Sequence, residues 1–307
     1  MPPQVSVIIP TYNRGPYIAE AIRSAQAQAY ANVEIIVADD GSTDETAEIA
    51  AGFGDAITCV HLPHSGQPAV TRNRGLEKAS GELIAFLDSD DQFLPNKLTL
   101  QVAALAEHPE AGCVYSNGHF FRDDPAQSSG YVLDGMPTPS GEILGALLRG
   151  NFLVPSVVLV RRTCLEAVGL FDEDPALFVA EDYELWLRVA THVPVIYAPG
   201  TVAAIRRHGE SISRDVAALR GCALLALAKL EGNRPDLRLS YATAFNEGYA
   251  RNHGAIALAH LQHWQITRGL SHALRALRYS LRTPGLGTKP LLEWARRRRV
   301  RGTAAMP

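Results

Sequence analysis

Three carboxylates follow directly on a short apolar segment, in the sequence Asp88-Ser89-Asp90-Asp91. Residues 83–87 before them are apolar and typical of a β-strand, so the acids would lie where that strand ends. Like charges this close repel one another unless a cation lies among them. Carboxylate oxygens are the ligands that Mg²⁺ and Mn²⁺ prefer, and such metals often bring phosphates with them. The pattern predicts a site for a divalent metal and a phosphate-bearing ligand.

A second apolar segment, residues 33–38, also runs into acids, at Asp39 and Asp40. Open α/β sheets bind ligands beyond the carboxyl ends of their strands. A carboxylate at this point can accept a hydrogen bond from an N–H group of a nucleobase. Ser42 or Asp44 is expected to cap the helix that follows. Two acidic strand ends within the first 91 residues therefore predict one nucleotide–metal site.

Two basic segments are further candidates for this site. The turn Pro10-Thr11-Tyr12-Asn13-Arg14 follows the first strand, where Tyr12 offers an aromatic face for a base and Arg14 a cation for phosphate. Arg72 and Arg74 precede the acidic strand. One of these two arginines could reach the phosphate or the base, and the other is expected on a solvated helix face.

Two further candidate site residues, an aspartate and a histidine, lie between residues 180 and 210. Asp182 lies at the start of an aromatic-rich helix, where a carboxylate either favours the helix dipole or deprotonates an acceptor hydroxyl in a cleft. His208 follows a strand and is flanked by Arg206 and Arg207. A lone histidine is more often structural or solvated, and contact with a ligand or phosphate is the alternative.

The elements that must position these residues alternate between strand and helix. We expect strands at 5–10, 33–39, 57–62, 82–87, 112–121, 156–160 and 195–205. Helices are expected at 15–28, 68–79 and 98–107, with another that opens at 42–45 and one within 178–193. This order predicts an α/β fold with a mostly parallel mixed sheet and helices on both faces. After about residue 215 the chain is rich in alanine and leucine at helical spacing. We predict a catalytic domain at 1–214, a helical region at 215–283 and a basic tail at 284–307.

The amino-acid composition excludes several classes of protein. The 307 residues are 47% hydrophobic and 20% charged, as in a soluble globular protein, and no apolar run approaches the roughly 20 residues of a membrane span. The four scattered cysteines and the missing signal peptide fit a reducing cytoplasm. The tail carries six basic residues against Glu293, on an otherwise acidic chain. This distribution argues against nucleic-acid binding, and the tail suits either anionic lipid or a solvated terminus.

Taken together and in this order, these blocks resemble the family 2 glycosyltransferases, which have the GT-A fold. The resemblance covers roughly residues 5–213. It rests on Pro10–Arg14, Asp39–Asp44, Arg72–Gly75, Asp88–Asp91, Gly169–Asp172 and Glu181–Trp186.

The resemblance implies a role for each matching residue. Thr11 and Tyr12 would line the base and ribose pocket, and Asp39 would hydrogen-bond the base, most often uracil. Asp90 would hold Mn²⁺ or Mg²⁺, His208 lies where some relatives supply a metal or diphosphate ligand, and Asp182 would be the general base. The remaining nucleotide- and donor-binding residues would be Pro10, Arg14, Arg72, Asp88 and Ser89.

The family's chemistry would make the protein an inverting, metal-dependent glycosyltransferase. It would move a sugar, most often from a UDP-sugar, to a hydroxyl of a saccharide or lipid-linked saccharide in bacterial surface-polysaccharide synthesis. A sugar nucleotidyltransferase is one alternative, although it would be expected to carry a glycine-rich basic phosphate loop near the first strand. A non-catalytic nucleotide-sugar-binding scaffold is the other. We expect a cytoplasmic protein that contacts the inner face of the membrane through its tail, with the helical region as a surface for a homodimer.

Overall fold

A computed structural model describes residues 2–208 and 215–283. The chain divides into two compact units, one of Met1–Ile143 with Phe152–Ser211 and one of Leu144–Asn151 with Ile212–Pro307. The segment 144–151 thus groups with the second unit, whereas the sequence prediction placed it in the domain 1–214. The predicted basic tail at 284–307 lies outside the described residues.

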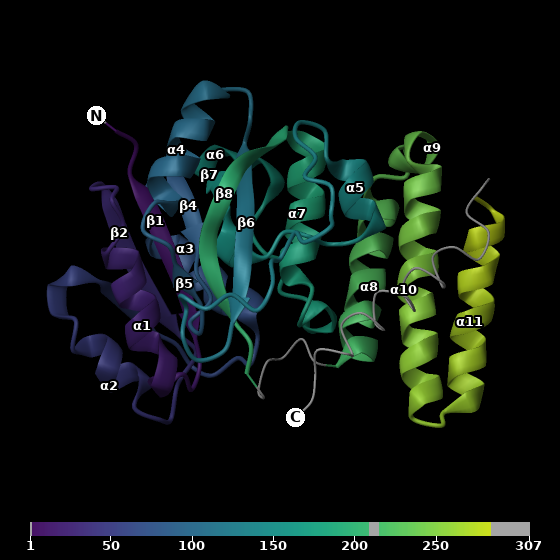
Figure 1. The fold of residues 1–307 in the computed structure, drawn as a ribbon, viewed down its shortest axis with the longest axis horizontal. Helices are drawn as coiled ribbons and strands as arrows, with labels where there is room; N and C mark the ends of the chain where they lie inside the picture. The colour runs from purple at the N-terminus through teal and green to yellow at the C-terminus, as the bar shows by residue number, and fades with distance from the viewer. Residues whose placement is uncertain (1, 209–214, 284–307) are drawn as a thin grey trace. The chain divides into compact units, whose positions relative to one another are not determined.

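The first unit is built on one eight-stranded sheet (Figure 1). Its strands are β1 (Val5–Thr11), β2 (Val33–Asp39), β3 (Thr58–His61), β4 (Leu83–Phe86), β5 (Gln92–Phe93), β6 (Cys113–Phe121), β7 (Val158–Arg161) and β8 (Val195–Arg206), in the order β3-β2-β1-β4-β7-β6-β8-β5. The pairs among β3, β2, β1 and β4 are parallel, as is β6 with β8, whereas β7 and β5 run antiparallel to their neighbours. The predicted α/β fold with a mostly parallel mixed sheet is confirmed.

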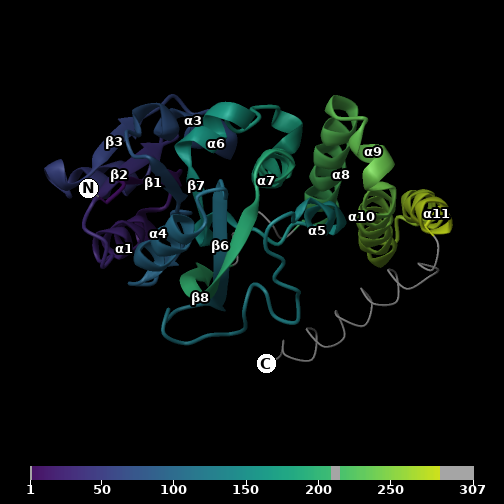
Figure 2. The same ribbon diagram turned by 90° about the horizontal axis from the view of Figure 1, so that it is seen from above.

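Helices cover both faces of this sheet. They are α1 (Gly15–Gln26), α2 (Thr46–Ala51), α3 (Pro68–Lys78), α4 (Lys97–Glu107), α6 (Arg162–Val168) and α7 (Glu181–His192), with 3₁₀ turns η1 (Gly54–Ala56), η2 (Pro155–Val157) and η3 (Pro175–Leu177). Figure 2 shows α3 and α6 on one face and α1 and α4 on the other. In α1, Ile18, Ala21, Ile22 and Ala25 are all buried, as their helical spacing predicts.

Two local differences from the sequence prediction have simple physical causes. The strand expected from residue 156 begins only at Val158, because Pro155 opens the 3₁₀ turn η2. Proline has no N–H group to donate to a neighbouring strand. The two-residue strand β5 and the short helix α6 were not predicted, since each is too short for its hydrophobic period to be recognised.

The second unit is helical. It contains α5 (Leu144–Arg149), α8 (Val216–Asn233), α9 (Leu237–Ser240), α10 (Ala242–Gln262) and α11 (Ile266–Leu281). The central helix α10 packs against α5, α8 and α11. Gly248 allows the approach to α5, because a Cβ there would lie 2.0 Å from the carbonyl oxygen of Leu148. Within residues 2–208 and 215–283, no helix is both long and apolar enough to cross a bilayer.

Candidate active site

The candidate residues gather at the carboxyl edge of the parallel strands in the first unit. Thr11 at the end of β1 is aligned with Asp39 at the end of β2. On the other side of β1, Phe86 of β4 is aligned with Ile8, and the Leu87 amide donates to the carbonyl of Ile8 at 2.9 Å. The chain then continues into the acidic turn, residues 88–91. Parallel pairing therefore brings both acidic strand ends to one edge of the sheet.

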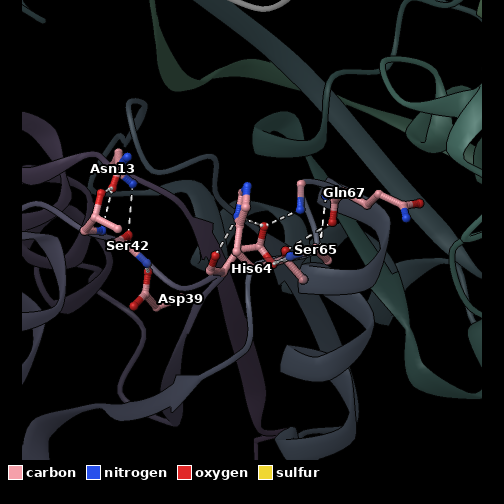
Figure 3. Close-up of polar contacts among 10 residues, drawn as sticks. Asn13, Asp39, Ser42, His64, Ser65 and Gln67 are labelled. Carbon is pink, nitrogen blue, oxygen red and sulfur yellow. Dashed lines mark hydrogen bonds and ion pairs between the residues drawn. The ribbon is translucent and has the colours of Figure 1, made fainter.

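The turns after β1 and β2 are joined by side chains (Figure 3). The amide of Asn13 donates to the Ser42 hydroxyl at 2.9 Å, and that hydroxyl donates to Asp39 Oδ1 at 2.5 Å. Ser42 is thus engaged with Asp39 and does not cap α2. The Asp44 carboxylate accepts from the Thr46 amide at 3.0 Å, so Asp44 alone makes the expected contact with the first turn of α2.

Asp40 organises the loop that follows β3. Its buried carboxylate accepts hydrogen bonds from the amide and hydroxyl of Ser65, at 2.9 and 2.8 Å, and from the Gly66 amide at 2.8 Å. His64 in the same loop, labelled in Figure 3, stacks on the ring of Tyr12 with centroids 4.1 Å apart. The Tyr12 side chain keeps 39% of its surface exposed. The stack holds an aromatic ring at the edge where a base would lie.

Arg72 links the acidic turn to the start of α7. The buried guanidinium donates from Nη2 to Asp88 Oδ1 at 2.7 Å and from Nη1 to Glu181 Oε1 at 2.5 Å. Burial works against its charged form, yet the two carboxylates raise the pKa of Arg72. Burial also raises the pKa of Glu181, against the opposing effect of Arg72. Among the described residues, Glu181 Oε2 and Arg72 Nε are buried and have no hydrogen-bond partner.

Asp182 lies beside this ion pair, in the first turn of α7. Its carboxylate accepts from the Tyr183 amide at 2.6 Å and is partly buried. Burial, followed by the charge of Glu181, raises the pKa of Asp182 to about 7, although Arg72 acts in the opposite direction. A carboxylate whose pKa lies near neutrality can take up a proton during a reaction at physiological pH.

The acidic turn also meets the end of β8. His208 Nε2 lies 2.7 Å from Asp90 Oδ2, although the two residues are 118 positions apart in the chain. The adjacent Asp91 accepts from the Arg206 amide at 2.9 Å and from the Ser156 hydroxyl at 2.6 Å. Asp91 therefore holds the segment that carries His208 close to the acidic turn, through its hydrogen bond to the Arg206 amide.

Asp91 itself is deeply buried, and this has electrostatic consequences. Burial, with the charges of Asp90 and Asp88, raises the pKa of Asp91 well above its usual range. The Ser156 hydroxyl and the Arg206 amide oppose this effect by hydrogen bonding. The Ser156 hydroxyl also accepts from the Asp88 amide at 3.2 Å. One serine thus joins the two ends of the acidic turn.

Asp90 and His208 fit a divalent metal as a partial ligand set. Their oxygen and nitrogen meet at hydrogen-bond distance, and both side chains are partly exposed. No group of three His, Cys, Asp or Glu side chains in the described parts of the chain is arranged to hold a metal. The pair therefore suits a metal that takes its other ligands from phosphate oxygens and water, as Mg²⁺ commonly does.

The other predicted site residues also lie near this edge. The Thr11 hydroxyl is buried and has no partner in the described part of the chain, and Ser89 is buried within the acidic turn. Pro10 is half-buried in β1, and Arg14 Nη1 donates to the Asn13 carbonyl at 3.1 Å. Arg74 pairs with Glu77 on the exposed side of α3, away from Arg72.

Sequence reasoning did not single out three residues of this site. In the sequence Glu181 is only a neighbour of Asp182, and its partner Arg72 is 109 positions away. The sequence predicts Ser156 inside a strand and gives Asp91 only as part of the acidic run. Their pairing carries no local signal, since it joins helices and turns that meet only in the folded unit.

Comparison with known families gives a direct match. A family model described as "Glycosyl transferase family 2" matches residues 6–162. This range includes the acidic strand ends, Arg72 and Ser156.

Relatives carry related names. An uncharacterized glycosyltransferase of Rickettsia felis is 32% identical over 70% of this chain, and the chain spans 36% of that relative's length. The UDP-Glc:alpha-D-GlcNAc-diphosphoundecaprenol beta-1,3-glucosyltransferase WfaP of Escherichia coli is 34% identical over 60% of this chain and 69% of its own length.

Solved structures share the fold at lower sequence identity. S. aureus TarS 1-349 in complex with UDP-GlcNAc superposes with a TM-score of 0.60 and 20% identity, covering 88% of this chain and 89% of that one. The mannosyltransferase PcManGT from Pyrobaculum calidifontis, in complex with GDP-Man and Mn²⁺, gives a TM-score of 0.62 and 20% identity, covering 95% of this chain and 86% of that one. Both likenesses support the GT-A fold.

Proposed function

This chain belongs to glycosyl transferase family 2, and on that basis we propose that it is an inverting, metal-dependent glycosyltransferase. It transfers a sugar from a nucleoside-diphosphate sugar, with UDP-sugars preferred, to a hydroxyl of a saccharide or lipid-linked saccharide. Residues 1–214 form its catalytic domain. Family membership removes the sugar nucleotidyltransferase as an alternative.

One observation carries the proposal. Arg72 ties Asp88 of the acidic turn to Glu181, which places Asp182 beside the same edge of the sheet as Asp90 and His208. A diphosphate-binding group, a sugar-binding acid and a base are therefore available from two sets of paired side chains that share the acidic turn. This is the set that displacement of a nucleoside diphosphate by a hydroxyl requires.

The donor is held by the first half of the site. Tyr12, supported by its stack on His64, packs against the base, and Asp39 accepts a hydrogen bond from it. Thr11 and Pro10 complete the pocket, and Arg14 and Ser89 contact the ribose and phosphates. Asp88 binds the ribose or donor sugar in an orientation that Arg72 fixes, because both terminal nitrogens of this arginine are already engaged by carboxylates.

Asp90 and His208 hold the divalent ion, Mn²⁺ or Mg²⁺. When bound, this ion stabilises the negative charge that develops on the leaving diphosphate. Asp91 contributes through Asp90, since its hydrogen bond to the Arg206 amide keeps the end of β8 near the acidic turn.

Asp182 removes the proton from the acceptor hydroxyl. Attack on the face opposite the leaving group, in a single displacement, inverts the configuration at the anomeric carbon. The raised pKa of Asp182, about 7, allows this side chain to bind the proton as the new glycosidic bond forms.

Two features support a lipid-linked acceptor and a peripheral location. The WfaP relative is named for an undecaprenol-linked acceptor. The sequence of the tail at 284–307 combines arginines with Leu291, Leu292 and Trp294. We therefore assign the protein to surface-polysaccharide synthesis on the cytoplasmic side of the membrane, with the tail touching lipid.

The proposal is tested by calorimetric titration with UDP, GDP, dTDP and CDP, each in the presence of Mn²⁺ and of EDTA. We expect selective binding of UDP that requires Mn²⁺ and is lost in Asp90→Ala. Asp55→Ala, which removes an exposed carboxylate from η1, is the matched control and should bind as the parent does.

Each contrary outcome overturns a different part of the proposed function. Equal affinity in EDTA contradicts the metal site, and preference for another nucleotide contradicts the UDP assignment. Absence of binding to every nucleotide contradicts the donor site and favours a scaffold. With a UDP-sugar and a lipid-linked saccharide, an NMR spectrum of the product that retains the donor's anomeric configuration contradicts inversion.

A further inference from the structure

Helix α11 of the second unit exposes a row of large apolar side chains. They are Ile266, Leu270, Leu274, Leu277 and Leu281, and the most exposed are Leu274 at 68% and Leu281 at 77%. Their spacing of three or four residues places them along one side of the helix. We call this row the leucine stripe. An exposed apolar row of this length is typical of an interaction surface.

Another side of α11 already has a partner. Gly269, Ala276 and Ser280 are buried, and α10 is the helix against which α11 packs, as Figure 1 shows. A Cβ at Gly269 would lie 2.7 Å from Leu261 Cγ, so the two helices are in close contact. The leucine stripe is therefore not used to hold α11 on α10.

The turn before α11 presents a further large apolar side chain. Trp264 is 84% exposed and has a φ of 57°, a left-handed conformation that is uncommon for a bulky residue. Two residues later the leucine stripe begins. Tryptophan is enriched where a membrane meets water, because its ring is apolar and its N–H group can stay hydrated.

The charges of this region are of one sign. Arg268, Arg275, Arg278 and Arg282 are all exposed, and residues 248–283 contain no aspartate or glutamate. A second copy of α11 laid on the first would bring these arginines together, which costs energy. An anionic phospholipid surface would instead neutralise them while it receives the leucines.

We propose that α11, with Trp264, is a membrane-docking face that lies on an anionic bilayer, with the leucine stripe in the apolar layer and the arginines among the lipid phosphates. This goes beyond the proposed function, because it depends on neither the donor nor the metal. Docking would hold the enzyme at the surface where a lipid-linked acceptor is found.

The test is co-sedimentation of the full chain with two kinds of vesicle, phosphatidylcholine alone and phosphatidylcholine with phosphatidylglycerol. We expect binding to the anionic vesicles that weakens with added salt. The double variant Leu274→Glu/Leu281→Glu should lower that affinity by roughly tenfold or more, since two leucines that would enter the apolar layer of the bilayer are lost. Leu239→Glu, at an 89% exposed leucine of α9 outside the stripe, is the matched control and should bind as the parent does.

Two further arms separate the other occupants of this face. A full-length variant with the substitutions Arg296→Gln, Arg297→Gln, Arg298→Gln and Arg299→Gln tests the tail. If it abolishes vesicle binding while the stripe variant binds normally, the proposal is overturned in favour of the tail. If the full chain does not bind anionic vesicles and the stripe variant differs from it only in oligomeric mass in solution, the face joins two copies. The proposal is then overturned.

Folding and donor binding are controlled independently. Circular dichroism should show the same thermal unfolding for the stripe variant and for Leu239→Glu, and both should bind UDP as the parent does. A chain that binds vesicles but no nucleotide would contradict the proposed function and leave the docking face intact. The reverse result would contradict only the docking face.

Discussion

The carboxylates that follow β2 and those that follow β4 lie at the same edge of one sheet but are held in different ways. Asp39 and Asp40 accept hydrogen bonds from hydroxyls and backbone amides and also contact the imidazoles of His61 and His64, and all of these partners come, at most, 26 positions later in the chain. Asp88 and Asp90 instead contact the side chains of Arg72 and His208, and Asp91 contacts Ser156 and the backbone of Arg206.

The difference reflects what each set must do. Donors from nearby positions in the chain can satisfy a carboxylate at a small entropic cost, and these hydrogen bonds are made whenever the turns form. Acids that stand together without a cation need charged partners or protonation, because burial and mutual repulsion both oppose their ionised forms. The β2 turn is thus formed by short-range contacts, whereas the β4 turn depends on the correct assembly of distant segments.

The largest difference between these regions is expected from Asp182→Asn, a substitution at α7 beside the β4 turn. We expect kcat to fall by about 10²–10⁴-fold, because the acceptor hydroxyl loses its base. Calorimetric binding of UDP should be unchanged, since the β2 turn is not touched. Loss of nucleotide affinity together with kcat would mean that Asp182 serves the donor and not the acceptor.

Ser156→Ala tests the dependence of the β4 turn on distant partners. Removing the hydroxyl leaves the buried Asp91 with one hydrogen bond fewer, which should lower the free energy of unfolding by about 1–3 kcal/mol. The activity should also need a higher Mn²⁺ concentration. Ser116→Ala is the matched control, because Ser116 of β6 is as deeply buried as Ser156 but its hydroxyl accepts a hydrogen bond from Gln101 of α4. Equal effects of the two changes on the Mn²⁺ requirement would contradict the role of Ser156.

Glu181→Gln should shift the pH dependence of kcat without removing activity. Asp182 is active when deprotonated, so the rate rises as pH rises through its pKa of about 7. Burial is the first cause of that raised pKa and the charge of Glu181 the second, so removing the charge should move the acid limb to lower pH. Glu184→Gln, which changes a buried acid of α7 paired with Arg188, should leave the limb in place. A limb that moves upward or does not move contradicts the coupling.

The smallest effect is expected at the β2 turn, in Ser65→Ala. Asp40 keeps the amides of Ser65 and Gly66, so losing one hydroxyl should cost only about 0.5–1.5 kcal/mol in nucleotide binding. Titration with UDP measures this directly. A loss of UDP affinity as large as that in Asp90→Ala would show that the β2 turn is as sensitive to the loss of one contact as the β4 turn. It would contradict the difference between the two turns.

The sequence by itself determined the alternation of strands and helices and hence the parallel core of the sheet. It also determined that Asp39 and Asp88 to Asp91 follow strands, because a strand's hydrophobic pattern and the acids after it are local properties of the chain. The family resemblance came from these same local blocks, and the match to residues 6–162 confirms it.

Only the tertiary structure decided which distant residues meet the acids. The contacts of Arg72 with Glu181, of Asp90 with His208 and of Asp91 with Ser156 span 65 to 118 positions. The exposure of the leucine stripe belongs to the same class, since helical spacing cannot tell a buried face from an exposed one. Such pairings depend on how helices and turns from different parts of the chain come together around the sheet, and no short segment of sequence contains that information.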